Sequence, residues 1–351
     1  MRKERFDSID GLKGLLSILI MVCHLQWTIP RGEELGLGYF AYVVDIFIAL
    51  SGFLTAYNHK EKIAGEEFLS FFSKRYFKLI PLYWITNLCM YFYECFVKYM
   101  TGNEKCGNHD AVCMILKMSG FYTGWFTSDR PCNKVTWTIC CLFLCYCIYY
   151  CICKISKKSQ SLYIILCAVV FFVTLYYVRN LNLDFPQYMG ICTMCDFAFG
   201  LLLYEIYSYI SNVSGKIIFA LFLIADLIFL GLGSVYSDLY LTNYTVDNHR
   251  FMLLVVTPVL FFGVMYVKPL KLLFSTKIFK WFGSISMSLY MWHFVVINIL
   301  NFDKLHLKGN NWGWSVMVAL AIGVAAFSHF IFEPIINKGM KKALSIAKKE
   351  D

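Results

Sequence analysis

Two ionisable residues within one apolar run could do chemistry. The run IDGLKGLLSILIMVCH, residues 9–24, carries Lys13 near its start and His24 at its end. Ionisable groups inside a membrane helix are costly to bury, so they are functional candidates by default. In a helix, eleven residues place these two groups roughly 16 Å apart along the axis, about half of a hydrocarbon core. We therefore expect a positive charge near one membrane face and a proton-transfer group near the middle.

The composition indicates an integral membrane protein. Of 351 residues, 59% are hydrophobic and only 16% are charged, whereas a soluble domain carries about 25% charged residues. The first apolar run is too long for a signal peptide and lacks a small-residue cleavage site, so we expect it to be retained. The net charge of +9 does not indicate a nucleic-acid partner, because the positive charges gather in alternate loops.

The pattern of apolar segments predicts an all-α polytopic membrane protein. We expect a single membrane domain over residues 1–351, with a bundle over about 11–333 and no soluble C-terminal domain. The loops on the N-terminal side hold 21 Lys and Arg and those on the other side hold 10, so both termini should be cytoplasmic. The ten predicted spans run roughly over residues 11–30, 38–58, 79–99, 135–153, 161–179, 188–210, 216–233, 251–267, 281–300 and 314–333.

The 15 cysteines predict neither a disulfide scaffold nor a metal site. Most of them lie in or beside apolar segments, where a free cysteine behaves as a small hydrophobic residue. We expect no metal. Cys106, Cys113 and Cys132 share the longest loop, and one pair of them could form a disulfide if that loop faces an oxidising compartment.

Three titratable side chains from three predicted spans share one depth. At 1.5 Å per residue, His24, Asp45 and His293 all fall slightly outside the bilayer midplane, and Asp196 falls near them. His24 could act as a general base on a hydroxyl group, with a carboxylate orienting its other ring nitrogen. Asp45 is the first candidate for that carboxylate, and His293 could instead be a structural or substrate-orienting partner.

A second layer of charge is predicted at the cytoplasmic face. It contains Lys13, Arg75 and Lys78, with Glu333 at the end of the last span. Arg75 and Lys78 are three residues apart and therefore lie on one helix face. They suit an anionic, phosphate-bearing ligand, although lipid head groups would also satisfy them. Glu333 is expected to form a structural ion pair with a neighbouring cation.

Two aromatic residues are candidates for substrate binding, Trp137 and Tyr290. Aromatic side chains at helix ends commonly form interfacial belts. Trp137, at a predicted outer end, could instead stack on a sugar ring.

Five segments of the chain resemble the acyltransferase-3 family of integral membrane O-acyltransferases, which acetylate surface polysaccharides. In order, the segments are SIDGLKGLLSILIMVCH, VVDIFIALSGFLTAY, FFSKRYFKLIPLYW, WFGSISMSLYMWHFVV and FSHFIFEPIINK. The resemblance implies acetyl-CoA as a cytosolic donor, with its phosphates held by Arg75, Lys78 and Lys13 and with Ser51 in the donor site. It implies that His24 is the essential catalytic residue. The acceptor would be a hydroxyl group of a cell-surface or lipid-linked glycan at the cell membrane.

The chain departs from the family pattern at two positions. Many members carry an acid five residues after the tryptophan of the fourth span, where this chain has Leu142. Lys78 stands where an arginine is usual, which weakens bidentate phosphate contact. The resemblance leaves open whether a covalent acyl-enzyme forms. The sequence does not specify the acceptor sugar, the acyl chain or the oligomeric state.

Two other classes of protein compete with this interpretation. A secondary transporter could also have ten spans and midplane ionisable groups, but it should show inverted repeats and matched broken helices. The sequence shows no such pairing. A lipid-binding structural protein would leave the midplane ionisable groups without a role.

Overall fold

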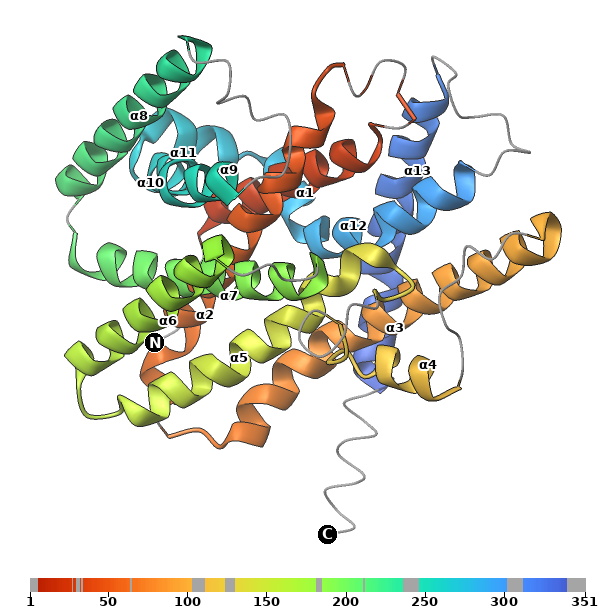
Figure 1. The fold of residues 1–351 in the computed structure, drawn as a ribbon, viewed down its shortest axis with the longest axis horizontal. Helices are drawn as coiled ribbons and strands as arrows, with labels where there is room; N and C mark the ends of the chain where they lie inside the picture. Colours follow the sequence, from red (N-terminus) through yellow and green to blue (C-terminus); the bar gives the residue numbers. More distant parts are fainter. Residues whose placement is uncertain are drawn as a thin grey trace.

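The computed structural model confirms an all-helical architecture (Figure 1). It describes residues 6–26, 28–29, 32, 34–63, 65–102, 111–123, 130–180, 185–210, 212–235, 246–301 and 312–339. Within these ranges every regular element is a helix and there is no strand.

The α-helices follow the predicted apolar segments closely. They are α1 (Asp7–His24), α2 (Val43–Ile63), α3 (Phe68–Thr101), α4 (Ala111–Met118), α5 (Trp137–Ile155), α6 (Gln160–Asn180), α7 (Phe185–Tyr209), α8 (Asn212–Val235), α9 (Val246–Phe251), α10 (Thr257–Tyr266), α11 (Lys268–Phe274), α12 (Lys277–Leu300) and α13 (Gly313–Phe327). Short 3₁₀ helices precede α2 (η1, Leu37–Tyr42) and α5 (η2, Lys134–Thr136). π-Helices join α9 to α10 (η4, Met252–Val256) and extend α13 (η6, Ser328–Phe332).

Among the described residues, seven helical runs are long and apolar enough to cross a membrane. They comprise α2, α5, α6, α7, the run from α9 to α10, α12, and α13 with η6. The other three predicted spans fall on α1, α3 and α8, which are also helical. The protein is therefore a polytopic membrane protein.

Helix α1 crosses α12 at a pair of glycines. A side chain on Gly14 would come within 2.6 Å of the backbone nitrogen of Gly283, and one on Gly283 would collide with the carbonyl of Asp10. Small residues at such crossings let helix backbones approach closely within membranes. This contact holds α1 and α12 together along their length (Figure 1), and it brings the outer half of α1 against the outer half of α12.

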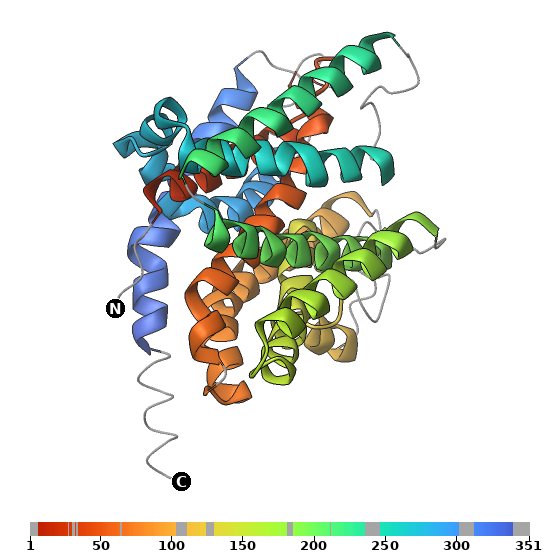
Figure 2. The same ribbon diagram turned by 90° about the vertical axis from the view of Figure 1, so that its left-hand side faces the viewer.

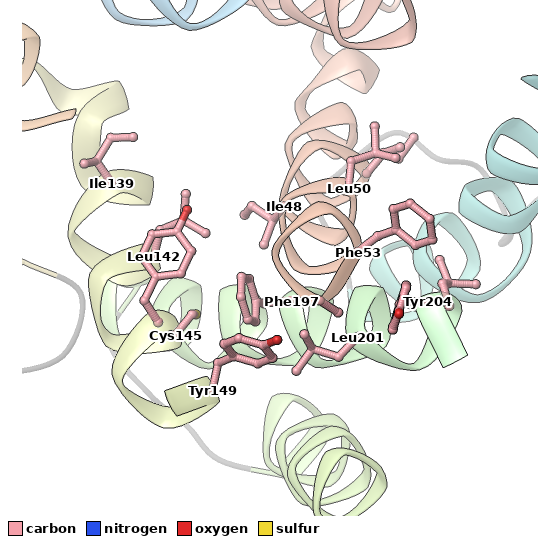
Figure 3. Packing of buried hydrophobic residues seen from close by; sticks show 14 of the residues in the cluster. Ile48, Leu50, Phe53, Ile139, Leu142, Cys145, Tyr149, Phe197, Leu201 and Tyr204 are labelled. Carbon is pink, nitrogen blue, oxygen red and sulfur yellow. The ribbon is translucent and has the colours of Figure 1, made fainter. Parts of the chain in front are cut away.

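Helices α2 and α7 form a second close crossing. A side chain on Gly52 would collide with the carbonyl of Phe197, and one on Gly200 would collide with the carbonyl of Ala49. The two helices lie side by side in both views (Figures 1 and 2). Phe197 packs between α2 and α5, with its ring centroid 5.8 Å from that of Tyr146 (Figure 3).

Two of the three loop cysteines lie within the described residues. Cys113 and Cys132 are both buried, whereas Cys106 lies outside the described residues. The possibility that one pair among the three forms a disulfide stays a prediction.

Candidate active site

Two histidines from opposite ends of the chain meet between α1 and α12. His293 Nε2 lies 3.3 Å from His24 Nδ1, and the ring centroids are 5.0 Å apart. His293 is fully buried, and Phe294 packs edge-on against the His24 ring, with a centroid separation of 5.5 Å. Since the close α1–α12 crossing brings these two helix faces together, the glycines of that crossing position the pair.

The hydrogen bonds of the two rings define which nitrogens carry protons. His24 Nδ1 lies 2.9 Å from the carbonyl oxygen of Ile20, and His293 Nδ1 lies 3.0 Å from that of Leu289. A carbonyl oxygen only accepts hydrogen bonds, so in the neutral rings both Nδ1 atoms donate. His293 Nε2 is then an acceptor, and the single His24 Nδ1–H is shared between the Ile20 carbonyl at 2.9 Å and His293 Nε2 at 3.3 Å. His24 Nε2 is left as the nitrogen with an available lone pair.

Asp45 lies in a different cluster, against His249 of α9. Its Oδ2 atom is 3.9 Å from His249 Nε2, which is also 2.9 Å from Asp196 Oδ1 of α7. All three side chains are buried. Their ligand atoms lie within 4.8 Å of one another, a separation that could accommodate a metal ion or shared protons. The expectation that Asp45 orients His24 therefore has no support in this geometry, because the ring in contact with His24 Nδ1 is that of His293.

An open cavity of about 1750 Å³ extends from the helix ends predicted to be cytoplasmic toward the histidine pair. Its innermost residues are Phe47, Leu82, Leu142 and Met291. Met291 precedes His293 by two residues, a rise of roughly 3 Å along α12. The cavity thus extends from the predicted cytoplasmic layer toward the depth of the histidine pair, although neither histidine is among its lining residues.

Several lysine and arginine side chains line the mouth of this cavity, at the helix ends predicted to be cytoplasmic. Arg75 and Lys78 are two of them. The Arg75 guanidinium lies 3.5 Å from the centroid of the Phe71 ring, and one of its terminal nitrogens donates to the Phe71 carbonyl. Its other terminal nitrogen, NH2, is buried without a hydrogen-bond partner among the described residues. Burial lowers the pKa of Arg75, although a guanidinium remains charged in proteins.

Lys78 lies among the other charged residues of the cavity wall. Partial removal from solvent lowers the pKa of Lys78, and the nearby positive charges of Lys13 and Arg75 lower it further. Glu333 and Asp10 act in the opposite direction. A bound anion would relieve the repulsion among these cations.

The remaining residues of the predicted cytoplasmic layer also line the cavity. Lys13 pairs with Asp10 one turn away, at 2.5 Å. Ser51 donates to the Phe47 carbonyl at 3.1 Å. Glu333 accepts hydrogen bonds from Ser288 and, at 3.1 Å, from Ser328, and its other oxygen lies 3.6 Å from His329.

The two aromatic candidates differ in their environment. Trp137 begins α5 and is half-buried. Tyr290 is buried, and its hydroxyl donates to the Val135 carbonyl at 2.7 Å and lies 2.9 Å from Thr138 Oγ1. The Tyr290 ring lies 6.0 Å from the His293 ring, so it packs beside the histidine pair while its hydroxyl bonds to neighbouring parts of the fold.

His249 is the residue near these clusters that sequence reasoning did not identify. It lies just before the predicted eighth span, where a histidine beside an arginine reads as part of an outer loop. The structure places it instead within α9, three residues before the η4 π-helix that begins at Met252. The sequence did hold one indication that His249 is buried, because it lies within one helical turn of an apolar segment.

The family comparison agrees with this architecture. The acyltransferase domain of the acyltransferase-3 family matches residues 6–330, so the chain belongs to that family of membrane acyltransferases. Comparison with curated proteins and with solved structures gives no match. Family membership implies acyltransferase activity, with an acyl donor and an acceptor.

Proposed function

We propose that the protein transfers an acetyl group from cytosolic acetyl-CoA to a hydroxyl group of a cell-surface or lipid-linked glycan. The observation that carries this proposal is the cavity, whose wall holds Arg75 and Lys78 and, farther in, Met291, which precedes His293 by two residues. A donor with phosphates at one end and a thioester at the other matches that arrangement. The charged end of a single helix could bind the phosphates but would not also hold the thioester near the histidine pair.

The donor site is supported by the charges of the cavity wall. Arg75 and Lys78 lie on one face of α3, and the Arg75 NH2 group has an unfilled hydrogen-bonding position. Charge-assisted hydrogen bonds from such groups are the usual ligands of phosphates. Lys13 contributes less positive charge because Asp10 partly neutralises it, and Ser51 lines the path between the two ends.

The transfer step is assigned to His24. His24 Nε2 accepts the proton of the acceptor hydroxyl as its oxygen attacks the thioester carbonyl. A new carbon–oxygen bond forms, the carbon–sulfur bond breaks, and the proton passes to the departing CoA thiolate, which leaves as the thiol. His293 holds the His24 ring by accepting from its Nδ1–H group. This scheme needs no metal and no covalent acyl-enzyme.

The experiment compares the acetyl content of surface glycans in cells that lack the gene and carry either the wild-type chain or His24→Ala. We expect acetylation only with the wild-type chain, at equal protein levels in the membrane. The control is Lys158→Ala, which changes an exposed residue outside the cavity and should leave acetylation unchanged. Unchanged acetylation with His24→Ala would overturn the mechanism, and unchanged acetylation without the gene would overturn the function.

A further inference from the structure

A small apolar pocket opens beside the inner end of the cavity, between α2, α5 and α12. We call it the side pocket. It shares Phe47, Leu142 and Met287 with the cavity wall, and it is closed by Val44, Ile48 and Ile139. Figure 3 shows Ile139 and Leu142 on the side of α5 that faces Ile48 of α2. The shared residues make the side pocket the neighbour of the deepest part of the cavity.

The side pocket offers no free polar group. Its polar lining residues are Thr138 and Tyr290, and their hydroxyls are 2.9 Å from each other, while the Tyr290 hydroxyl also donates to Val135. A polar occupant would lose its hydrogen bonds to water without replacing them. The pocket is therefore suited to an apolar group.

The side pocket also lies close to the catalytic candidates and is small. The Tyr290 ring stacks on Phe47, with a centroid separation of 6.1 Å, and lies 6.0 Å from His293. The free volume of the pocket is about 10 Å³, roughly the space of one water-sized group. An acyl carbon chain that extends from a carbonyl near His24 would find room here for its first carbon and little more.

We propose that the side pocket receives the apolar end of the donor's acyl group, and that Leu142 limits its length to two carbons. This inference rests on the proposed function and adds a specificity-determining residue to it. Leu142 reaches both the cavity and the side pocket from α5. Its replacement by alanine removes three carbons from their shared wall and would open space for a longer chain.

The test measures the binding of acetyl-CoA, propionyl-CoA, butyryl-CoA and free CoA to the full chain in lipid nanodiscs by titration calorimetry. We expect the wild-type chain to bind the acetyl donor at least as tightly as the longer ones. Leu142→Ala should favour butyryl-CoA over acetyl-CoA by on the order of tenfold more than the wild type, since each buried methylene strengthens binding severalfold. The control is Leu144→Ala, which changes a leucine of the same helix that lines neither space.

The outcomes separate this inference from the proposed function. If Leu142→Ala and the wild type rank the four compounds alike, the side pocket does not select the acyl chain, while the donor site stands. If neither free CoA nor any acyl-CoA binds the wild type, the proposed function itself fails. Should Leu142→Ala not fold, Ile139→Ala opens the same pocket from its far wall and must show the same change of preference.

Discussion

His24 and His293 lie 269 positions apart in the chain, yet their rings are joined through Nδ1 of the first and Nε2 of the second at 3.3 Å. The two rings have different hydrogen-bonding roles. His293 is anchored to its own helix through Nδ1 and accepts through Nε2, whereas His24 keeps Nε2 available. This asymmetry supports the proposed assignment of proton transfer to His24 and of orientation to His293.

His293→Ala should lower the rate of acetyl transfer by on the order of tenfold or more, because the His24 ring loses the acceptor that orients it. His293→Gln should retain more activity, since its amide oxygen can accept from His24 Nδ1–H. Initial rates over a range of acetyl-CoA concentrations would show a fall in kcat with little change in the KM of the donor. Equal rates for the alanine and glutamine variants would contradict an orienting role.

Arg75→Ala should weaken acetyl-CoA binding by about tenfold or more, which corresponds to the loss of a hydrogen bond to a charged group. Arg75→Lys should recover part of this loss, because the charge remains but the planar fork does not. The matched control is Lys158→Ala, which removes a positive charge at an exposed position outside the cavity. Calorimetric titration of each variant gives the dissociation constants, and equal affinities for Arg75→Ala and the wild type would exclude phosphate binding by this residue.

The lowered pKa of Lys78 predicts a dependence of donor binding on pH. A bound anion favours the charged amine, so it raises the pKa of Lys78 from its lowered value in the free protein. Affinity should therefore be full at pH values below that lowered pKa and should fall as the pH rises through it. Titrations with acetyl-CoA between pH 7 and pH 9.5 test this, and Lys78→Arg should flatten the dependence because a guanidinium stays charged. A fall of the same size in Lys78→Arg would assign the effect to another group.

Gly283→Ala should destabilise the protein by about 1–3 kcal/mol, because its methyl group would push α12 away from α1 at the carbonyl of Asp10. Gly323→Ala in α13 is the matched control, since its added carbon would meet nothing within 4 Å. It should be neutral or slightly stabilising, as expected for alanine in a helix. Thermal unfolding in detergent compares the two, and a Tm for Gly283→Ala equal to that of Gly323→Ala would show that the crossing is looser than described.

The sequence predicted the helices and the depth of their ionisable groups, but depth alone does not select neighbours. Asp45 and His293 are both predicted at the depth of His24, and only the packing of α1 on α12 and of α2 on α7 decides which of them meets it. Arg75 and Lys78 were placed on a common face correctly because spacing within one helix determines that relationship. The partners of the Tyr290 hydroxyl come from the segment around η2, whose path no periodic pattern specifies.

The depth of the cavity also determines where the membrane voltage acts. An open cavity carries the electrolyte of one compartment into the bilayer, so little potential difference develops along its length. The remaining potential drops across the thin layer that contains His24 and His293, where each elementary charge that crosses the full field exchanges about 2.3 kcal/mol per 100 mV. If the acceptor hydroxyl enters from the far side, the proposed passage of its proton to the departing CoA thiolate would move that proton through most of that field.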